Sequence, residues 1–214
     1  EVPSRGLGDV YKRQIFESIH KNISMNSKTI LATFLVTSFM ISFSQSYESH
    51  KYETLFSEDN FEVRNYEPVL KAKTYSEKGS NDNFGKLFRY ISGYNEKNQK
   101  ISMTTPVYMK QENEKSMMEF VLPSKFSLEN VSQPLSNQVE IYKDKGGLYA
   151  SVRYSGYSNS SKRNKHRKVL IQKLKELDIN PLGDFLYLSY DSPYKFYNRR
   201  NEVVVAIKDF EKIN

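Results

Sequence analysis

Cysteine is absent from the 214 residues, and histidine occurs only three times. Without cysteine, the chain has no disulfide, no cysteine-linked lipid anchor and no thiolate ligand for a metal. The sequence also contains no paired histidines at metal-ligand spacing, no Ser/His/acid arrangement and no glycine-rich phosphate loop. These absences argue against a metalloenzyme and favour a non-enzymatic function.

The positive charge of the chain is modest and spread along the sequence. The formal net charge is +7 for the whole chain and +5 for residues 47–214, because residues 1–46 hold five Lys/Arg and three acidic residues. Such an excess can attract anionic ligands or an acidic surface, but it does not by itself indicate nucleic-acid binding. We therefore expect no nucleic-acid partner.

Residues 25–46 have the pattern of a secretory signal peptide. Met25 is followed by a basic residue, Lys28, a short apolar run and then small residues. The run of about 14 residues is shorter than the roughly 20 of a membrane-spanning helix, so a retained anchor is the less favoured alternative. We expect cleavage before Tyr47 and a secreted or periplasmic protein without a membrane span. Residues 1–24 are interpreted as an upstream extension or an assembly artefact.

The first half of the remaining chain predicts strands around one helix. Residues 61–74 alternate between apolar and polar on either side of Pro68, which predicts a half-buried strand with a bend. The following segment predicts a helix of about three turns that starts at Asn81 or Asp82 and ends at Gly93. Its apolar residues recur at helical spacing: Phe84, Leu87, Phe88 and Ile91.

Two strands then follow in "KISMTTPVYMK" and "SMMEFVLP", separated by the polar turn "QENEKS". Because proline cannot donate a hydrogen bond to a sheet ladder, Pro106 is expected at a bulge or an edge. We interpret the strand around Pro106 as the barrel wall behind the first helix. Ligand contact by Met103 or the neighbouring threonines is the alternative.

The second half repeats this order of elements. Residues 137–156 predict two strands joined at Gly146 and Gly147, and the last predicted strands surround a loop within residues 184–210. Between them, residues 160–178 predict a basic helix whose run "KRNKHRK" is interpreted as a solvated face. Its inward side is expected to carry Val169, Leu170, Leu174 and Leu177.

Residues 47–214 are long enough for one domain with a substantial core. Two strand–helix–strands repeats predict an α+β fold, a distorted antiparallel β-barrel or curved sheet with two flanking helices. The repeat is weak at the level of identical residues, so the prediction concerns only the order of the elements.

Two longer motifs, "RYISGYNEKNQKISMTTPV" and "YDSPYKFYNRRNEVVV", resemble the signature regions of the SOUL family of haem-binding proteins. The segments "FEVRNYEP" and "VRYSG" fall at the matching order and spacing, and the resemblance covers about residues 52–209. It implies a distorted β-barrel with two helices. It also implies that a tetrapyrrole is bound non-covalently in an apolar cleft outside the barrel, between the first helix and a loop near the C-terminus.

The resemblance also implies candidate ligand contacts. Phe84 and Phe88 match apolar contact positions of the haem-binding branch, although a core role for both is an equal alternative. Arg89 and Lys195 match basic positions where a cation can pair with a haem propionate. Tyr194 lies beside Lys195 in the same loop, and Asn81 stands where that branch has a further basic residue, so its contact would be weaker.

The sequence departs from one branch of the family at the axial iron ligand. That branch has a histidine where this chain has Asn65, and asparagine is a poor ligand for haem iron. His50 is expected in a flexible start, and His166 is expected on the inner side of the basic helix rather than on iron. We therefore assign no metal ligand. The segment "NRRNEV" is interpreted as a structural cluster that fixes the preceding loop, with ligand contact as the alternative.

Three functions remain to be separated. The first is an exported carrier or buffer for haem or a related tetrapyrrole, binding as a monomer and without catalysis. The second is a barrel for another hydrophobic small molecule or a protein partner, with haem affinity lost. The third is an enzyme that acts on tetrapyrroles, for which the sequence offers no catalytic residues.

Overall fold

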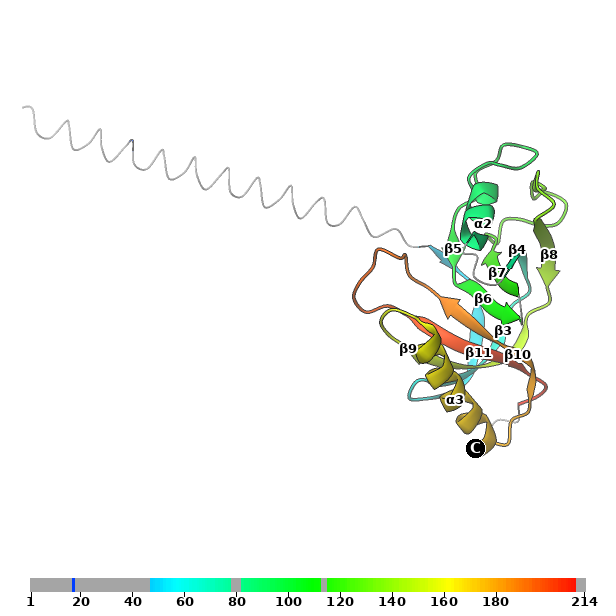
Figure 1. Cartoon of the computed structure of the whole chain (residues 1–214). Coiled ribbons are helices and arrows are strands. Elements are labelled where there is room, and N and C mark those ends of the chain that lie inside the picture. Colours follow the sequence, from blue (N-terminus) through cyan, green and yellow to red (C-terminus); the bar gives the residue numbers. More distant parts are fainter. Residues whose placement is uncertain (1–16, 18–46, 78–81, 113–114, 211–214) are drawn as a thin grey trace, which may run out of the picture. The chain divides into compact units, whose positions relative to one another are not determined.

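The computed structural model describes residues 17, 47–77, 82–112 and 115–210 (Figure 1). The fold below is that of the second unit of the chain, residues 47–214. The predicted signal segment and Asn81 lie outside the described residues. None of the helices in the described ranges is long and apolar enough to cross a membrane.

The second unit is built on one antiparallel sheet of nine strands that curls into a half-barrel (Figure 1). Its two outer strands are β2 and β8. A separate small parallel sheet pairs β1 (Glu48–Ser49) with β5 (Thr104–Thr105). In spatial order, the large sheet runs β2 (Tyr52–Glu58), β3 (Phe61–Tyr66), β9 (Gly147–Tyr154), β11 (Asn201–Ile207), β10 (Pro181–Ser189), β6 (Val107–Glu112), β7 (Lys115–Val121), β4 (Val69–Glu77) and β8 (Val139–Asp144).

One helix covers the outer face of each half of the sheet. Helix α2 (Asn83–Ile91) packs on β4 and β7, and helix α3 (Ser160–Glu176) packs on β9 and β11 (Figure 1). The predicted repeat is confirmed in the order of elements: the run β3, β4, α2, β6, β7 corresponds to β8, β9, α3, β10, β11, and the first half adds β1, β2 and β5. The halves exchange one strand each, because β3 pairs with β9 of the second half and β8 pairs with β4 of the first. This exchange joins both halves in one sheet.

Each helix closes its own apolar core. The core under α3 contains Leu170 and Leu174 of the helix with Val63, Val152 and Val203 of the sheet. The inward face predicted for this helix is wrong at Val169, which is exposed, because the buried stripe is narrow and needs only one residue per turn. Asn159 caps the start of the helix, since its Oδ1 accepts the Lys162 N–H at 2.9 Å.

The wall behind α2 is formed as predicted by the segment around Pro106. Ile101, Met103 and Val107 pack in the core under α2, so the core interpretation of Met103 is confirmed. Pro106 lies at the break between β5 and β6, where the chain passes from the small sheet to the large one. The expectation that Pro106 lies at an irregular position is therefore confirmed. At this break no hydrogen bond of the sheet requires a backbone N–H, which proline lacks.

The inner face of the sheet carries charged and tyrosine side chains, because strand residues alternate between the helix-covered face and this one. The guanidinium of Arg64 donates two hydrogen bonds to Glu202, at 2.6 and 3.0 Å, and both side chains are buried. Glu202 also accepts a bond from Tyr190 at 2.9 Å and pairs with Arg200 at 2.7 Å. We call this group, with Tyr66, the inner network.

A second buried cation lies further along the same face. The Lys71 ammonium pairs with Asp144 at 2.5 Å and with Glu119 at 3.4 Å, and it lies 3.9 Å from the centre of the Tyr108 ring. Each carboxylate of this group therefore has a cationic partner. Burial raises the pKa of Tyr108 well above its usual value of 10, so its hydroxyl stays protonated. The interior therefore combines paired polar groups with a third apolar cluster that includes Val121, Leu188 and Val204.

His50 is not in a flexible start, contrary to the expectation, but is buried between β1 and β2. Its Nε2 donates to the Glu67 carbonyl at 2.8 Å, so Nδ1 is the acceptor for the Tyr108 hydroxyl at 2.8 Å. This residue is held in place by the β1–β5 pair and by strand β2. The sequence patterns predicted neither this pair nor β2. The geometry thus selects a neutral imidazole with one defined tautomer.

This arrangement predicts a loss of stability in mild acid. Burial lowers the pKa of His50 below its usual 6.5, with a smaller contribution from the Lys71 charge, so the unfolded chain takes up the proton first. The free energy of unfolding should therefore decrease as pH falls below about 6.5. Urea denaturation across this range should show a shallower decrease in His50→Gln. Equal slopes in both proteins would contradict the assignment.

Candidate functional site

Two phenylalanines of α2 point away from the core. Phe84 is 41% exposed and Phe88 is 49% exposed, and their rings are stacked with centroids 5.7 Å apart and planes 14° apart. The buried face of the helix is made by Asn83, Leu87, Tyr90 and Ile91. Neither ring belongs to the buried core cluster under α2, although both lie at its edge. The pair forms an apolar surface one turn long.

The aromatic pair rests on a fixed support. The Phe84 ring meets the Phe120 ring of β7 edge-on, with centroids 5.4 Å apart. The Tyr90 hydroxyl donates to the Ser132 carbonyl at 2.9 Å, and the Asn83 amide donates to the Ser116 carbonyl at 2.9 Å. These bonds set the rotation of α2 about its axis. An incoming flat ligand would therefore meet a surface that is already ordered.

A polar hollow is lined by other residues of α2 and by the segments that follow it. Arg89 lies 4.5 Å from the centre of the Tyr94 ring, and both line a hollow of about 540 Å³ together with Lys86 and Leu135. Arg89 is exposed, as the sequence-based assignment requires. At 3.6 residues per turn, Lys86 and Arg89 project from a different side of α2 than Phe84 and Phe88, so the helix carries separate apolar and cationic surfaces. Tyr94 was missed by the sequence argument, since its contact with Arg89 depends on the turn that follows the helix.

The other predicted contacts lie in the loop between β10 and β11. Tyr194 is almost fully exposed, and the Lys195 ammonium pairs with Asp191 at 2.6 Å. Lys195 is therefore a weaker candidate for a propionate than Arg89, because it already has a carboxylate partner. Among the described residues, no hydrogen bond or ring contact joins this loop to α2. A single cleft formed by α2 and this loop therefore remains a prediction.

The segment "NRRNEV" has the structural role that was favoured. The Arg199 guanidinium donates to the carbonyls of Ser192 and Lys195 at 2.8 and 2.7 Å, which fixes the loop from beneath. Arg200 and Glu202 belong to the inner network. A hollow of about 510 Å³ beside β1 is lined by Leu122, Phe126 and their neighbours, and it includes none of the predicted site residues.

A family model described as "SOUL heme-binding protein" matches residues 47–206. The chain belongs to the SOUL family. Heme-binding protein 2 of Homo sapiens is 31% identical to it over 165 residues, which span 70% of this chain and 79% of the human protein. Heme-binding protein 1 of Mus musculus is 30% identical over 125 residues, 55% of this chain and 66% of the mouse protein. Both names describe binding proteins, in line with the expected non-enzymatic function.

Solved structures share the fold of this SOUL protein at low sequence identity. An uncharacterised conserved protein from Listeria innocua superposes with a TM-score of 0.54 at 8% identity, over 71% of this chain and 94% of that one. The EcmrR C-terminal domain gives a TM-score of 0.52 at 10% identity, over 74% of this chain and 99% of that domain. At these identities, the likeness concerns the fold alone.

The two histidines in the described part of this SOUL protein, His50 and His166, have other partners. His166 is half-buried on α3, stacked on Tyr154 with centroids 4.3 Å apart, and its Nδ1 donates to the Lys162 carbonyl at 2.8 Å. Both ring nitrogens of His50 are hydrogen bonded, and Asn65 is exposed on β3. The described residues contain no cluster of three or more potential His or carboxylate ligands. The expectation that His166 faces the inner side of its helix is confirmed.

Proposed function

We propose that this SOUL protein binds haem or a related tetrapyrrole against Phe84 and Phe88, as an exported, non-enzymatic carrier or buffer. The observation that carries the proposal is the stacked and half-exposed aromatic pair, which the core of α2 does not need. The porphyrin face would lie on the aromatic pair. Arg89 would approach the propionates, and the loop with Tyr194 and Lys195 would close the other side of the cleft.

The binding free energy would come mainly from apolar burial. Fully burying a phenylalanine side chain contributes about 1.5–3 kcal/mol, whereas an exposed ion pair contributes about 0–1 kcal/mol. No histidine of the described residues is free to bind iron near α2. The affinity should therefore depend little on ionic strength, because only the smaller ionic share is screened.

A haemin titration of residues 47–214 tests the proposal. We expect a saturable shift of the Soret band and quenching of the tyrosine emission, which is unobscured because the chain has 16 tyrosines and no tryptophan. His166→Ala should leave the Soret position unchanged, since this residue is not expected to hold iron. A wild-type protein without a saturable shift would remove the basis for the proposal, and a spectrum that changed with time would indicate an enzyme.

The alternative is a different hydrophobic ligand on the same surface. Asn65 favours this alternative, because one haem-binding branch that the chain resembles has a histidine at that position. Mass spectrometry of the protein purified from its native source distinguishes the two. A bound lipid or other cofactor, with no tetrapyrrole, would favour the alternative.

Export is the second part of the proposal, and it is supported by the pattern of residues 25–46. Fused to a reporter, this segment should direct secretion, and the exported protein should begin near Tyr47. N-terminal sequencing of the secreted form provides the measurement. An exported protein that retained residues 1–24 would contradict the signal peptide and the interpretation of the upstream residues.

A further inference from the structure

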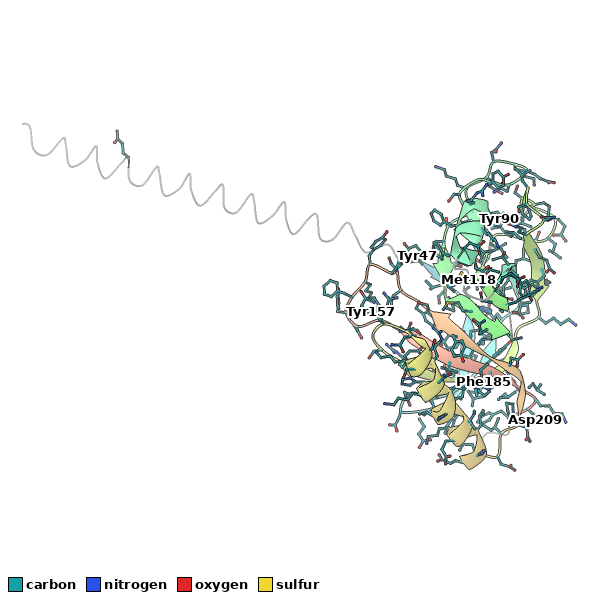
Figure 2. All side chains as sticks on the ribbon, in the orientation of Figure 1. Tyr47, Tyr90, Met118, Tyr157, Phe185 and Asp209 are labelled. Carbon is teal, nitrogen blue, oxygen red and sulfur yellow. The ribbon has the colours of Figure 1, made fainter. Side chains whose placement is uncertain are left out.

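Three neighbouring aromatic side chains are exposed in the loop between β10 and β11. Tyr194, Phe196 and Tyr197 are 90%, 75% and 66% exposed, and the last two rings contact each other with centroids 5.3 Å apart. Tyr157, at the edge of the molecule in Figure 2, is also exposed. We call these four residues the aromatic tip. Exposed aromatic side chains in such numbers mark interaction sites rather than ordinary surface.

The aromatic tip stands on an ordered base. Arg199 lies 4.9 Å from the centre of the Tyr157 ring while its guanidinium holds the carbonyls of the loop. The Asn201 amide donates to the Gly156 carbonyl at 2.8 Å, and Asp191 accepts the Arg200 N–H at 2.5 Å. These contacts join the two segments that carry the tip. Their order lowers the entropy lost on docking.

In the chain segment next to the aromatic tip, residues 145–175, all the charged side chains are positive. Residues 145–175 contain nine Lys/Arg and no Asp or Glu, and α3 begins at Ser160, three residues after Tyr157. Lys165 and Lys168 are exposed, and no ion pair among the described residues includes them, whereas Lys173 further along pairs with Glu58. At 1.5 Å per residue, Lys165 lies about 8 Å along the axis from the helix start.

We propose that the aromatic tip and the exposed basic face of α3 form a docking surface for an anionic phospholipid bilayer. Tyrosine and phenylalanine side chains bury well at the headgroup level of a bilayer, and each lysine near an anionic leaflet adds attraction. A single-stranded nucleic acid would instead need its stacking aromatics inside a basic groove. Here three of them lie in the loop that connects β10 and β11 (Figure 1), and Tyr157 lies between β9 and α3.

A single tryptophan reports on this surface, because the chain has none of its own. Every described strand, described helix of the fold and core cluster lies within residues 47–214, so a chain starting at Tyr47 keeps the whole fold. The variant Phe196→Trp is mixed, without any tetrapyrrole, with vesicles of equal parts phosphatidylcholine and phosphatidylglycerol. The control is Leu182→Trp, an exposed position at the opposite end of β10.

We expect a blue shift and quenching by brominated lipid for Phe196→Trp, and neither for Leu182→Trp. Adding Lys165→Glu and Lys168→Glu should weaken vesicle partitioning by about tenfold or more, as should high salt. Pure phosphatidylcholine vesicles should bind weakly. Because no tetrapyrrole is present, the result is independent of the proposed function.

Other outcomes would overturn the proposal. No shift with anionic vesicles, or an equal shift with neutral ones, would exclude an electrostatically assisted docking surface. A shift caused by an oligonucleotide but not by vesicles would assign the surface to nucleic acid. A shift that depended only on protein concentration would assign it to contacts between copies of the chain.

Discussion

Replacing Glu202 with alanine is expected to lower the free energy of unfolding by about 3–5 kcal/mol. Glu202 is fully buried and accepts hydrogen bonds from Arg64, Tyr190 and Arg200. Its removal leaves the buried Arg64 guanidinium without its main counter-ion, and an uncompensated charge in the interior is strongly destabilising. Chemical denaturation monitored by circular dichroism measures the loss.

The matched control is Glu140→Ala. Glu140 also forms an ion pair, with Lys73 at 3.3 Å, but it is exposed, so its loss should change stability by no more than about 1 kcal/mol. The paired replacement Arg64→Met with Glu202→Leu should be less destabilising than Glu202→Ala alone, because the fully buried guanidinium is removed together with its counter-ion, and Arg200, which then loses a partner, is partly exposed. A Glu202→Ala protein as stable as Glu140→Ala would show that the inner network contributes little to folding.

Glu202 is also expected to make the free energy of unfolding decrease at low pH. Burial alone would raise the pKa of Glu202, but the hydrogen bonds and charges of Arg64 and Arg200 outweigh it and hold the pKa below the usual 4.5. The stabilisation is therefore complete above pH 4.5 and is lost as pH falls through the lowered pKa. Glu202→Ala should lack this part of the acid dependence.

Replacing both Phe84 and Phe88 with alanine is expected to weaken haemin binding by about 30-fold, or roughly 2 kcal/mol. The two side chains are about half exposed in the free protein, so a bound porphyrin would bury the remaining part of each. Because neither belongs to the buried face of α2, the fold should be kept. Haemin titration, with circular dichroism as the check on folding, measures the change.

Two variants control for this result. Lys195→Ala should weaken binding by no more than about fivefold, because Lys195 is already paired with Asp191 and an exposed pair contributes little. Leu182→Ala removes a similarly exposed apolar side chain at a distant place and should have no effect. A folded double variant that bound haemin normally would show that the aromatic pair is not the site.

The order of the elements could be predicted because it rests on local patterns. Alternation marked β3 and β4, helical spacing marked α2 and α3, and Gly146 and Gly147 marked the turn between β8 and β9. The inner network could not be predicted, since Arg64 and Glu202 are 138 residues apart and only the curled sheet brings them together. His50 was misplaced for the same reason: its partner Tyr108 is 58 residues away.

The candidate site was predictable in part. Helical spacing put Phe84 and Phe88 on the same side as Leu87 and Ile91, but it could not decide which residues face the sheet. The rotation of α2 is decided by polar partners, because Tyr90 finds the Ser132 carbonyl in the core. Whether the loop with Tyr194 and Lys195 meets α2 around a ligand stays a prediction, as does the contribution of Asn81, which lies outside the described residues.

The most direct test of the central claim is a map of where haemin lies. Ferric haemin broadens the amide signals of nearby residues in nuclear magnetic resonance, whereas zinc protoporphyrin, which is diamagnetic, serves as the reference. Binding on the aromatic pair predicts that the amides of residues 83–94 lose intensity first, together with those of the loop around Tyr194 if it closes the cleft. Broadening confined to α3 around His166, or to the hollow beside β1, with the α2 signals intact, would contradict the account.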